Sequence, residues 1–315
     1  MNRAFVFPGQ GSQTIGMGRA LADAFASARD VFGEVDEALK QNLSKLMWDG
    51  PDSDLTLTEN AQPAIMAASY AVMAVLAREC GLDLARHARF VAGHSLGEYT
   101  ALAAAGAFTL SDAARLLKTR GRAMQDAVPV GEGAMSALLG AEIELAEEAA
   151  KEAAAETNGV CVVANDNSPG QVVISGTKAA VERAGEIAKA KGAKRAMMLN
   201  VSAPFHSPLM QPAADVMREA LAAVTIRPPA VPLIANVTAD QTAEPETIRR
   251  LLVEQVTGRV RWRQSVLRLR ELGVEMTVEA GGHKVLSGMT KRIDKELQIV
   301  TLDTPADIEA FAKTL

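Results

Sequence analysis

A five-residue turn between an apolar run and a helical stretch constrains this chain most. Gly93-His94-Ser95-Leu96-Gly97 follows a short β-type run at 89–92 and precedes an alanine-rich helical pattern at 96–105. A G-x-S-x-G sequence in this setting predicts a sharp turn that lifts the serine hydroxyl out of a sheet. Free backbone N–H groups and the helix dipole there favour developing negative charge. A chance match in a glycine turn would leave the flanking strand and helix unexplained, so Ser95 is a candidate nucleophile.

Short apolar runs alternate with longer helical stretches elsewhere too, which predicts an α/β fold with a parallel sheet. Strands are expected at 4–7, 89–92, 276–279 and 299–302. Helices are expected at 21–39, 61–80, 96–105, 111–128 and 284–295. Ser111 is the expected N-cap of the fourth helix. A chain of 315 residues suits one large domain with room for an insertion.

The middle of the chain has a different pattern. After the flexible segment at 131–133, charged helices and strands follow one another: strand 134–139, helix 142–156, strands 160–164 and 171–175, helix 178–191 and strand 196–201. This β-α-β-β-α-β order is typical of a ferredoxin-like unit. We therefore predict a ferredoxin-like subdomain over 128–199, inserted into a catalytic domain formed by 1–127 and 200–315.

Composition argues against two classes of partner. The net charge is −5 and no long basic run exists, so nucleic-acid binding has no electrostatic support. The first residues lack the apolar core and cleavage site of a signal peptide. The apolar, uncharged segment 63–77 is too short and too rich in alanine to span a bilayer. We expect a cytoplasmic protein without a membrane or nucleic-acid partner.

An activated serine needs a base, and the chain has four histidines. His94 is next to Ser95, but adjacent side chains of an extended segment diverge. His87 lies in a polar connection and is expected to be solvated. His206 and His283 each follow a predicted strand, where active-site loops gather. Two prolines fix the backbone around His206, which favours it over His283.

The group that would orient this histidine is not evident from the residues. In the usual α/β-hydrolase order an acidic residue lies between the serine and the histidine, and Asp126 and Asp166 are the candidates near predicted loops. Neither is convincing. A main-chain carbonyl is the alternative, because it accepts the same hydrogen bond from Nδ1–H.

A glycine-rich turn, Phe7-Pro8-Gly9-Gln10-Gly11-Ser12-Gln13, follows the first predicted strand. A dinucleotide-binding loop is the rival interpretation. It fails because Thr14 stands where a third glycine or alanine is needed, and because the acidic residue expected after a second strand is missing. We expect this turn to donate a backbone N–H to an oxyanion hole, a contact worth about 3–4 kcal/mol in the transition state.

Two arginines in Lys118-Thr119-Arg120-Gly121-Arg122 lie on the helix predicted at 111–128. Charges on a helix usually form a solvated face. The functional alternative is a guanidinium that points into the pocket and holds a substrate carboxylate by a two-pronged ion pair, which lysine does less well. The residues alone do not choose between Arg120 and Arg122.

Several motifs occur in order at the spacing of one known family: 7–13, 93–99, Asn165 with 167–171, and 205–207. The chain resembles, nearly end to end, the malonyl-CoA:acyl-carrier-protein transacylases of bacterial fatty-acid synthesis. The resemblance implies a hydrolase-like α/β core with the ferredoxin-like insertion. It also implies that Ser95 is the acylated nucleophile, that His206 is its base, and that the main-chain carbonyl of Gln255 orients the histidine in a dyad.

The resemblance assigns further residues. Arg120 matches the arginine that binds the malonyl carboxylate, and the backbone N–H groups of Gln10 and Leu96 match the oxyanion-hole donors. One departure stands out, since the family usually has Gly-Pro-Gly-Lys where this chain has Gly281-Gly282-His283-Lys284. The role of His283 therefore stays open.

The activity implied by the resemblance is that of an [acyl-carrier-protein] S-malonyltransferase with a ping-pong serine mechanism. Malonyl-CoA is the expected donor and the phosphopantetheine thiol of acyl carrier protein the acceptor, with no cofactor and no metal. We hypothesise that Phe205 crowds a branch at C2 and disfavours methylmalonyl, although one methyl is worth only about 1–3 kcal/mol. An acidic carrier would need a local basic patch, for which the candidates are Lys189, Lys191, Lys194 and Arg195.

Three other functions use some of the same features. A polyketide extender-unit acyltransferase is the nearest alternative, and a serine (thio)esterase would share the turn and the base but gain nothing from a buried arginine. A non-enzymatic module that binds a carrier protein is the third. The sequence does not indicate the oligomeric state, the pathway, the tolerance for branched acyl groups or the docking surface.

Overall fold

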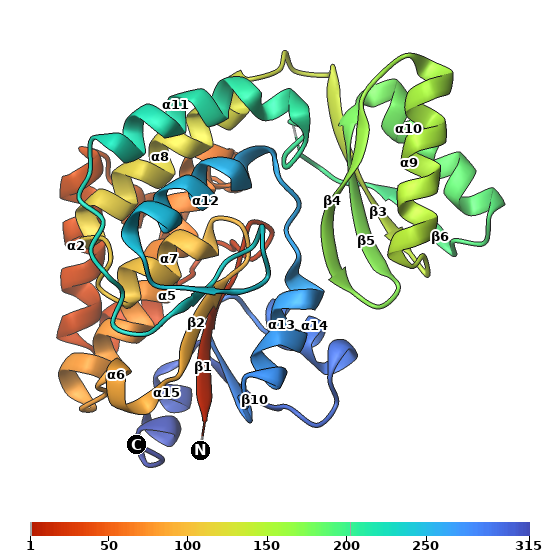
Figure 1. Cartoon of the computed structure of the whole chain (residues 1–315). Helices are drawn as coiled ribbons and strands as arrows, with labels where there is room; N and C mark the ends of the chain where they lie inside the picture. The colour runs from red at the N-terminus through yellow and green to blue at the C-terminus, as the bar shows by residue number, and fades with distance from the viewer. Residues whose placement is uncertain (1, 202) are drawn as a thin grey trace.

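The larger part of the protein is built on a six-stranded sheet (Figure 1). The computed structural model describes residues 2–201 and 203–315, so Met1 and Ser202 lie outside the described residues. The strands are β1 (Arg3–Phe7), β2 (Phe90–Gly93), β7 (Leu233–Ile234), β8 (Gln241–Thr242), β9 (Met276–Ala280) and β10 (Gln298–Leu302). Their order is β10-β9-β1-β2-β7-β8, parallel throughout except for the edge strand β8. The predicted α/β fold with a parallel sheet is confirmed.

Helices cover both faces of this sheet, because its central strands are apolar on both sides. From β1, Phe5 and Phe7 enter one core cluster, and Ala4 and Val6 enter the other. The core on the first face contains buried residues of ten helices: α1 (Arg19–Ala24), α2 (Ala26–Leu39), α3 (Leu43–Asp49), α4 (Asp52–Thr56), α5 (Thr58–Glu79), α7 (Gly97–Ala104), α8 (Leu110–Asp126), α11 (Gln211–Ala222), α12 (Pro245–Thr257) and α15 (Pro305–Ala312). The second face packs against α13 (Trp262–Glu271) and α14 (Val285–Ile293). The short helices α6 (Leu84–His87) and η1 (Pro208–Met210) lie in connections.

Helix α5 runs through the centre of the first core. It has 22 residues and is long and apolar enough, by length and composition, to cross a membrane. The prediction that the segment 63–77 is too short for this was therefore wrong. The most apolar window of the helix is 89% buried inside the protein. The apolar residues of α5 are therefore explained by packing between α2, α7 and α8.

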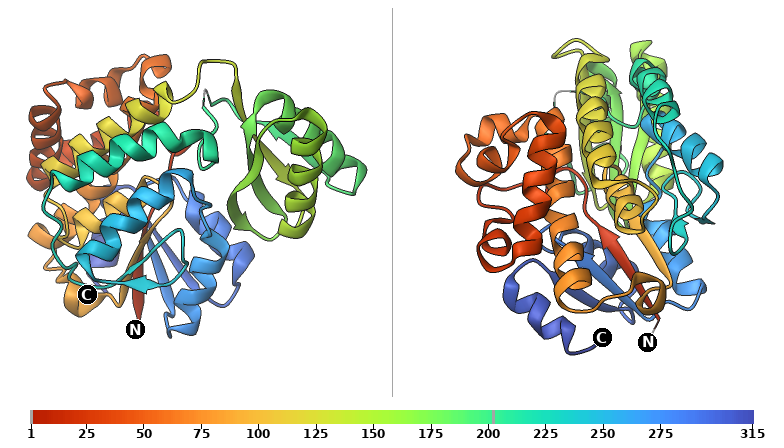
Figure 2. Two further views of the ribbon diagram at one scale, coloured as in Figure 1. Left: turned by 45° about the horizontal axis from the view of Figure 1, so that its top comes forward. Right: turned by 90° about the vertical axis from the view of Figure 1, so that its left-hand side faces the viewer.

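A second, four-stranded sheet lies beside the larger part (Figure 2). It comprises β3 (Gly133–Leu139), β4 (Cys161–Ser168), β5 (Gln171–Thr177) and β6 (Arg195–Met198), in the antiparallel order β4-β5-β3-β6. Helices α9 (Ile143–Thr157) and α10 (Lys178–Ala190) enclose a separate core with one face of it. The β-α-β-β-α-β element order is as expected, while the division into a ferredoxin-like subdomain over 128–199 and a catalytic domain formed by 1–127 and 200–315 stays a prediction.

Two local predictions were wrong. The helix expected at 21–39 is broken at Phe25, whose extended backbone (φ −126°) ends α1 and begins α2. No proline or glycine marks this break. The N-cap of α8 is Thr109, whose Oγ1 accepts the N–H of Asp112 at 3.0 Å, and the Ser111 hydroxyl instead donates to Glu34.

Candidate active site

Ser95 stands at the tip of a tight turn between β2 and α7. Its backbone lies in the left-handed region, with φ 54°, which is uncommon for a residue with a side chain. Two glycines make room for the turn: a Cβ at Gly93 would lie 1.9 Å from the carbonyl of Gly97, and a Cβ at Gly97 would lie 2.2 Å from the oxygen of Phe7. The serine is thereby lifted above the carboxyl ends of β1 and β2.

A buried asparagine braces this turn. The main-chain N–H of Ser95 donates to Oδ1 of Asn236 at 2.8 Å, and Nδ2 of Asn236 donates to the oxygen of Gly93 at 2.6 Å. Sequence reasoning missed Asn236. The available signal was its place directly after the apolar run at 231–235, which contains β7, the neighbour of β2.

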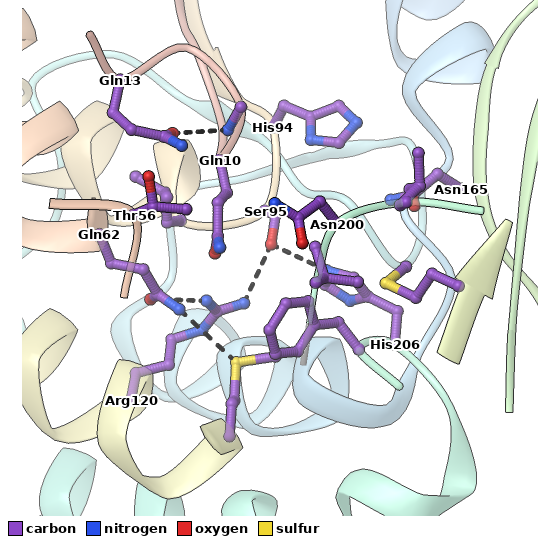
Figure 3. Close-up of a pocket in the computed structure, with 17 residues that line it drawn as sticks. Gln10, Gln13, Thr56, Gln62, His94, Ser95, Arg120, Asn165, Asn200 and His206 are labelled. Carbon is purple, nitrogen blue, oxygen red and sulfur yellow. Dashed lines mark hydrogen bonds between the residues drawn. The ribbon is translucent and has the colours of Figure 1, made fainter. Parts of the chain in front are cut away.

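The imidazole of His206 contacts the Ser95 hydroxyl, with Nε2 2.8 Å from Oγ (Figure 3). Its other nitrogen, Nδ1, lies 2.9 Å from the main-chain oxygen of Gln255 and 3.1 Å from that of Gly258. Two acceptors at Nδ1 place the proton there, so the lone pair of Nε2 faces the hydroxyl. The orienting groups are main-chain carbonyls at the end of α12, and not Asp126 or Asp166.

The electrostatic surroundings keep His206 neutral. The side chain is buried, with 4% of its surface exposed. Burial, followed by the nearby cation of Arg120, lowers the pKa of His206 to about 3. A neutral imidazole is the form that can accept the proton of the serine hydroxyl.

Arg120 is the buried arginine of the pair that the sequence left open. Its guanidinium is 1% exposed and donates through Nη1 to Gln62 Oε1 at 2.8 Å, and through Nη2 to Gln255 Oε1 at 2.8 Å and to Ser95 Oγ at 3.1 Å. Arg122 lies at the surface, with its side chain 68% exposed and paired to Glu59. Arg120 therefore points into the site and Arg122 does not.

These groups line one cavity of about 310 Å³ (Figure 3). Gln10 and Leu96 lie on its wall beside Ser95, and within the described part of the chain their backbone N–H groups have no hydrogen-bond partner. Leu199 and Phe205 supply apolar wall. The cavity thus combines a hydroxyl with a base, two free N–H donors and a buried cation.

Comparison with known proteins agrees with this geometry. Residues 4–303 match the acyl transferase domain family. The chain is 46% identical over 312 residues to the malonyl CoA-acyl carrier protein transacylase of Bacillus subtilis (strain 168), which covers 99% of this chain and 96% of the relative. The chain belongs to the malonyl CoA-acyl carrier protein transacylase family. The resemblance inferred from the motifs is confirmed.

Solved structures of this transacylase family superpose over the whole chain. The acyl-carrier-protein S-malonyltransferase from Bartonella henselae has a TM-score of 0.97 at 54% identity and covers 100% of this chain and 99% of its own. A malonyl-transacylase in complex with a type II PKS acyl-carrier protein has a TM-score of 0.96 at 41% identity and covers 100% of both chains. The fold and the family are therefore shared along the entire length.

Of the other predicted histidines, His94 lines the same cavity, whereas His283 is not among the residues that line it. His94 Nε2 contacts Asn167 Oδ1 at 2.8 Å, which links the serine turn to the small sheet. His283 lies between Thr14 Oγ1, at 2.9 Å from Nε2, and Asp303 Oδ2, at 2.6 Å from Nδ1. It therefore joins the first glycine-rich turn to the end of β10, and it does not contact Ser95.

Proposed function

We propose that this chain transfers a malonyl group from malonyl-CoA to the phosphopantetheine thiol of an acyl carrier protein, through a malonyl ester on Ser95, in fatty acid biosynthesis. The observation that carries the proposal is the double contact of the Ser95 hydroxyl, with His206 on one side and Arg120 on the other. A base next to the hydroxyl supports acyl transfer, and a buried cation at the same oxygen supports an acyl group that bears a carboxylate. The chain is accordingly an acyltransferase.

The first half-reaction acylates the serine. Ser95 Oγ attacks the thioester carbon of malonyl-CoA while its proton passes to Nε2 of His206. The N–H groups of Gln10 and Leu96 hold the oxyanion of the tetrahedral intermediate, each contributing about 3–4 kcal/mol. The C–S bond then breaks, and the departing thiolate of coenzyme A takes the proton from His206.

The second half-reaction runs the same steps with a new thiol. The phosphopantetheine thiol gives its proton to His206 and its sulfur attacks the ester carbon. The bond to Ser95 Oγ breaks, and the serine oxygen recovers the proton. Because the carbonyls of Gln255 and Gly258 hold Nδ1–H throughout, a dyad suffices and no acidic residue takes part.

The position of the Arg120 guanidinium next to Ser95 Oγ selects acyl groups that carry a carboxylate. The Nη2–H of Arg120 donates to Ser95 Oγ in the free protein. When that oxygen becomes part of a malonyl ester, a single methylene group separates the ester carbonyl from the free carboxylate. The carboxylate can therefore fold back onto the same N–H. The cation thus orients the reacting carbonyl from the far end of the acyl group.

The reaction as written needs the two thioester partners and groups of this chain, and we propose that it uses no cofactor or metal. We place it in the cytoplasm. For carrier docking, the basic patch predicted on the inserted subdomain needs revision, because Lys191 is paired with Glu148 and Glu152 at 2.7 Å. Lys189, Lys194 and Arg195 remain exposed candidates.

Mass spectrometry of the purified protein tests the proposal. Incubation with malonyl-CoA should add one malonyl group to Ser95, and Ser95→Ala should prevent it. Addition of holo-carrier protein should remove the group and load the carrier faster than water releases malonate. Faster release to water would instead support the thioesterase, and no adduct would support a binding module. A polyketide carrier assayed beside a fatty-acid carrier distinguishes the two pathways.

A further inference from the structure

A buried carboxyl group lies behind the site, and the reaction above does not use it. Glu98, the second residue of α7, is 1% exposed. Its Oε2 accepts hydrogen bonds from Nε2 of Gln255 at 2.5 Å and from the main-chain N–H of Asn236 at 3.4 Å. Its Oε1 has no partner among the described residues. A solvated acid would serve the dipole of α7 equally well, so burial at this cost calls for another reason.

The side-chain amide of Gln255 connects Glu98 to Arg120. Its Nε2 donates to Glu98 and to the main-chain oxygen of Ser95, the latter at 3.0 Å. Its Oε1 accepts from Nη2 of Arg120 at 2.8 Å. An acceptor at Glu98 requires the NH₂ end of the amide on its side, which leaves the carbonyl end for Arg120. Glu98 therefore sets the orientation of the amide, and the amide holds the guanidinium.

The amide also keeps the carboxyl group away from the guanidinium. A carboxylate in direct contact with Arg120 would form a two-pronged pair and occupy the N–H groups that a substrate carboxylate needs. With Gln255 between them, Glu98 reaches Arg120 only through the side-chain amide. Arg120 stays on the cavity wall with Nη2–H directed at Ser95 Oγ.

We propose that Glu98 is a positioning residue for dicarboxylic acyl groups: through the side-chain amide of Gln255 it holds Arg120 where the carboxylate of the acyl group meets it. The proposal rests on the malonyl transfer proposed above. The base depends on Glu98 much less, because the carbonyl that holds His206 is the main-chain oxygen of Gln255, which helix α12 fixes.

Two substitutions at one position separate positioning from charge. Glu98→Ala removes the acceptor, whereas Glu98→Gln keeps an acceptor oxygen in the same place and removes the charge. The measurement is kcat/KM for malonyl-CoA and for acetyl-CoA with the same holo-carrier protein. We expect Glu98→Ala to lower the malonyl-to-acetyl ratio roughly 10- to 100-fold, the scale of a misplaced orienting group. Glu98→Gln should restore a ratio close to that of the wild type.

Two results would overturn the proposal: an unchanged ratio in Glu98→Ala, including an equal loss for both acyl groups, or a Glu98→Gln ratio as low as that of Glu98→Ala. If Glu98→Ala does not fold, Gln255→Met takes its place, since it removes the amide and keeps the main-chain carbonyl. The ratio should fall in that variant too, and an unchanged ratio would count against the relay. When both single variants fold, the double variant Glu98→Ala/Gln255→Met should have a malonyl-to-acetyl ratio no lower than that of Gln255→Met alone. The two losses do not add, because both residues act through one contact. A wild-type enzyme without any preference for malonyl would contradict the proposed function itself, before any variant is compared.

Discussion

Nη2 of Arg120 donates a hydrogen bond to Oγ of Ser95 over 3.1 Å, so the cation proposed to hold the substrate carboxylate touches the nucleophile itself. The separation limits the acyl groups that can use both. A carboxylate that one methylene group separates from the reacting carbonyl can fold back onto the guanidinium, while a longer diacid must bend its chain or displace the cation. The contact therefore links the choice of acyl group to the position of attack.

Removal of this cation should abolish the preference for malonyl. In Arg120→Ala we expect kcat/KM for malonyl-CoA to fall about 30-fold or more, because truncating one side of a desolvated charge pair costs about 2–5 kcal/mol and each 1.4 kcal/mol is about tenfold. Acetyl transfer should fall much less, since acetyl has no carboxylate. Steady-state assays with both thioesters measure the ratio. Arg122→Ala, two residues along on the exposed surface, is the matched control and should keep the wild-type ratio.

The turn at Ser95 should tolerate no side chain at Gly97. In Gly97→Ala the new Cβ would lie 2.2 Å from the Phe7 oxygen, so the turn must open and malonyl loading of Ser95 should be lost. Gly33→Ala is the control, since Gly33 lies on the exposed side of α2 with no atom within 4 Å of its added Cβ. That variant should gain about 0.5–1 kcal/mol of stability, measured by urea unfolding. Full malonyl loading by Gly97→Ala would contradict the packing argument.

The size of Phe205 should restrict the acyl group at C2. Phe205 lines the cavity and is 7% exposed. Phe205→Leu should raise kcat/KM for methylmalonyl-CoA relative to malonyl-CoA by about tenfold, within the range of about 1–3 kcal/mol for one methyl. Competition between the two thioesters in one reaction measures the ratio directly. Equal use of both by the wild type would remove the basis of this hypothesis.

Sequence reasoning reached the parts of the site that depend on local pattern. The turn at Ser95 needs only a strand, two glycines and a helix in succession, and the loop of His206 follows a strand and contains two prolines. Both could be predicted from a few neighbouring residues. The choice between Arg120 and Arg122 could not, because it depends on which side of α8 faces the cavity.

The missing parts depend on contacts between distant segments. Asn236 lies 141 residues beyond Ser95 and follows a strand that has no strong local signature. Gln255 lies 160 residues beyond Ser95, and only the family resemblance singled it out. Strand β7 has only two residues, too few for a period to be visible. The carboxyl group of Glu98 looks like an ordinary helix-start acid in the sequence, and its burial becomes apparent only when Gln255 and Asn236 are brought into contact with it.

The base should stay active in mildly acidic solution. Since the pKa of His206 is lowered to about 3, the imidazole remains neutral well below its ordinary value of 6.5. The rate of Ser95 acylation by malonyl-CoA, measured in single turnovers, should therefore show no histidine-like loss between about pH 7 and pH 5. An acid limb centred near 6.5 that persists in Glu98→Gln would show that His206 titrates normally. A limb that disappears in that variant would belong to Glu98.

The buried carboxyl group of Glu98 should make stability fall as the pH rises. Burial is the main cause that raises its pKa from 4.5 to about 7. Below the lower value both the folded and the unfolded chain hold this proton, so the carboxyl group adds no pH dependence there. Between the two values the unfolded chain releases the proton and the folded chain keeps it, which costs the folded state about 3 kcal/mol by the upper end.

The variant Glu98→Gln tests this pH dependence, because glutamine does not titrate and all other groups are common to both proteins. The free energy of unfolding of Glu98→Gln, measured in urea, should therefore rise relative to the wild type by about 3 kcal/mol across this range and stay level above it. A difference that does not vary with pH would mean that the carboxyl group keeps its ordinary pKa, and a difference that changes in favour of the wild type would mean that Arg120 holds it ionised.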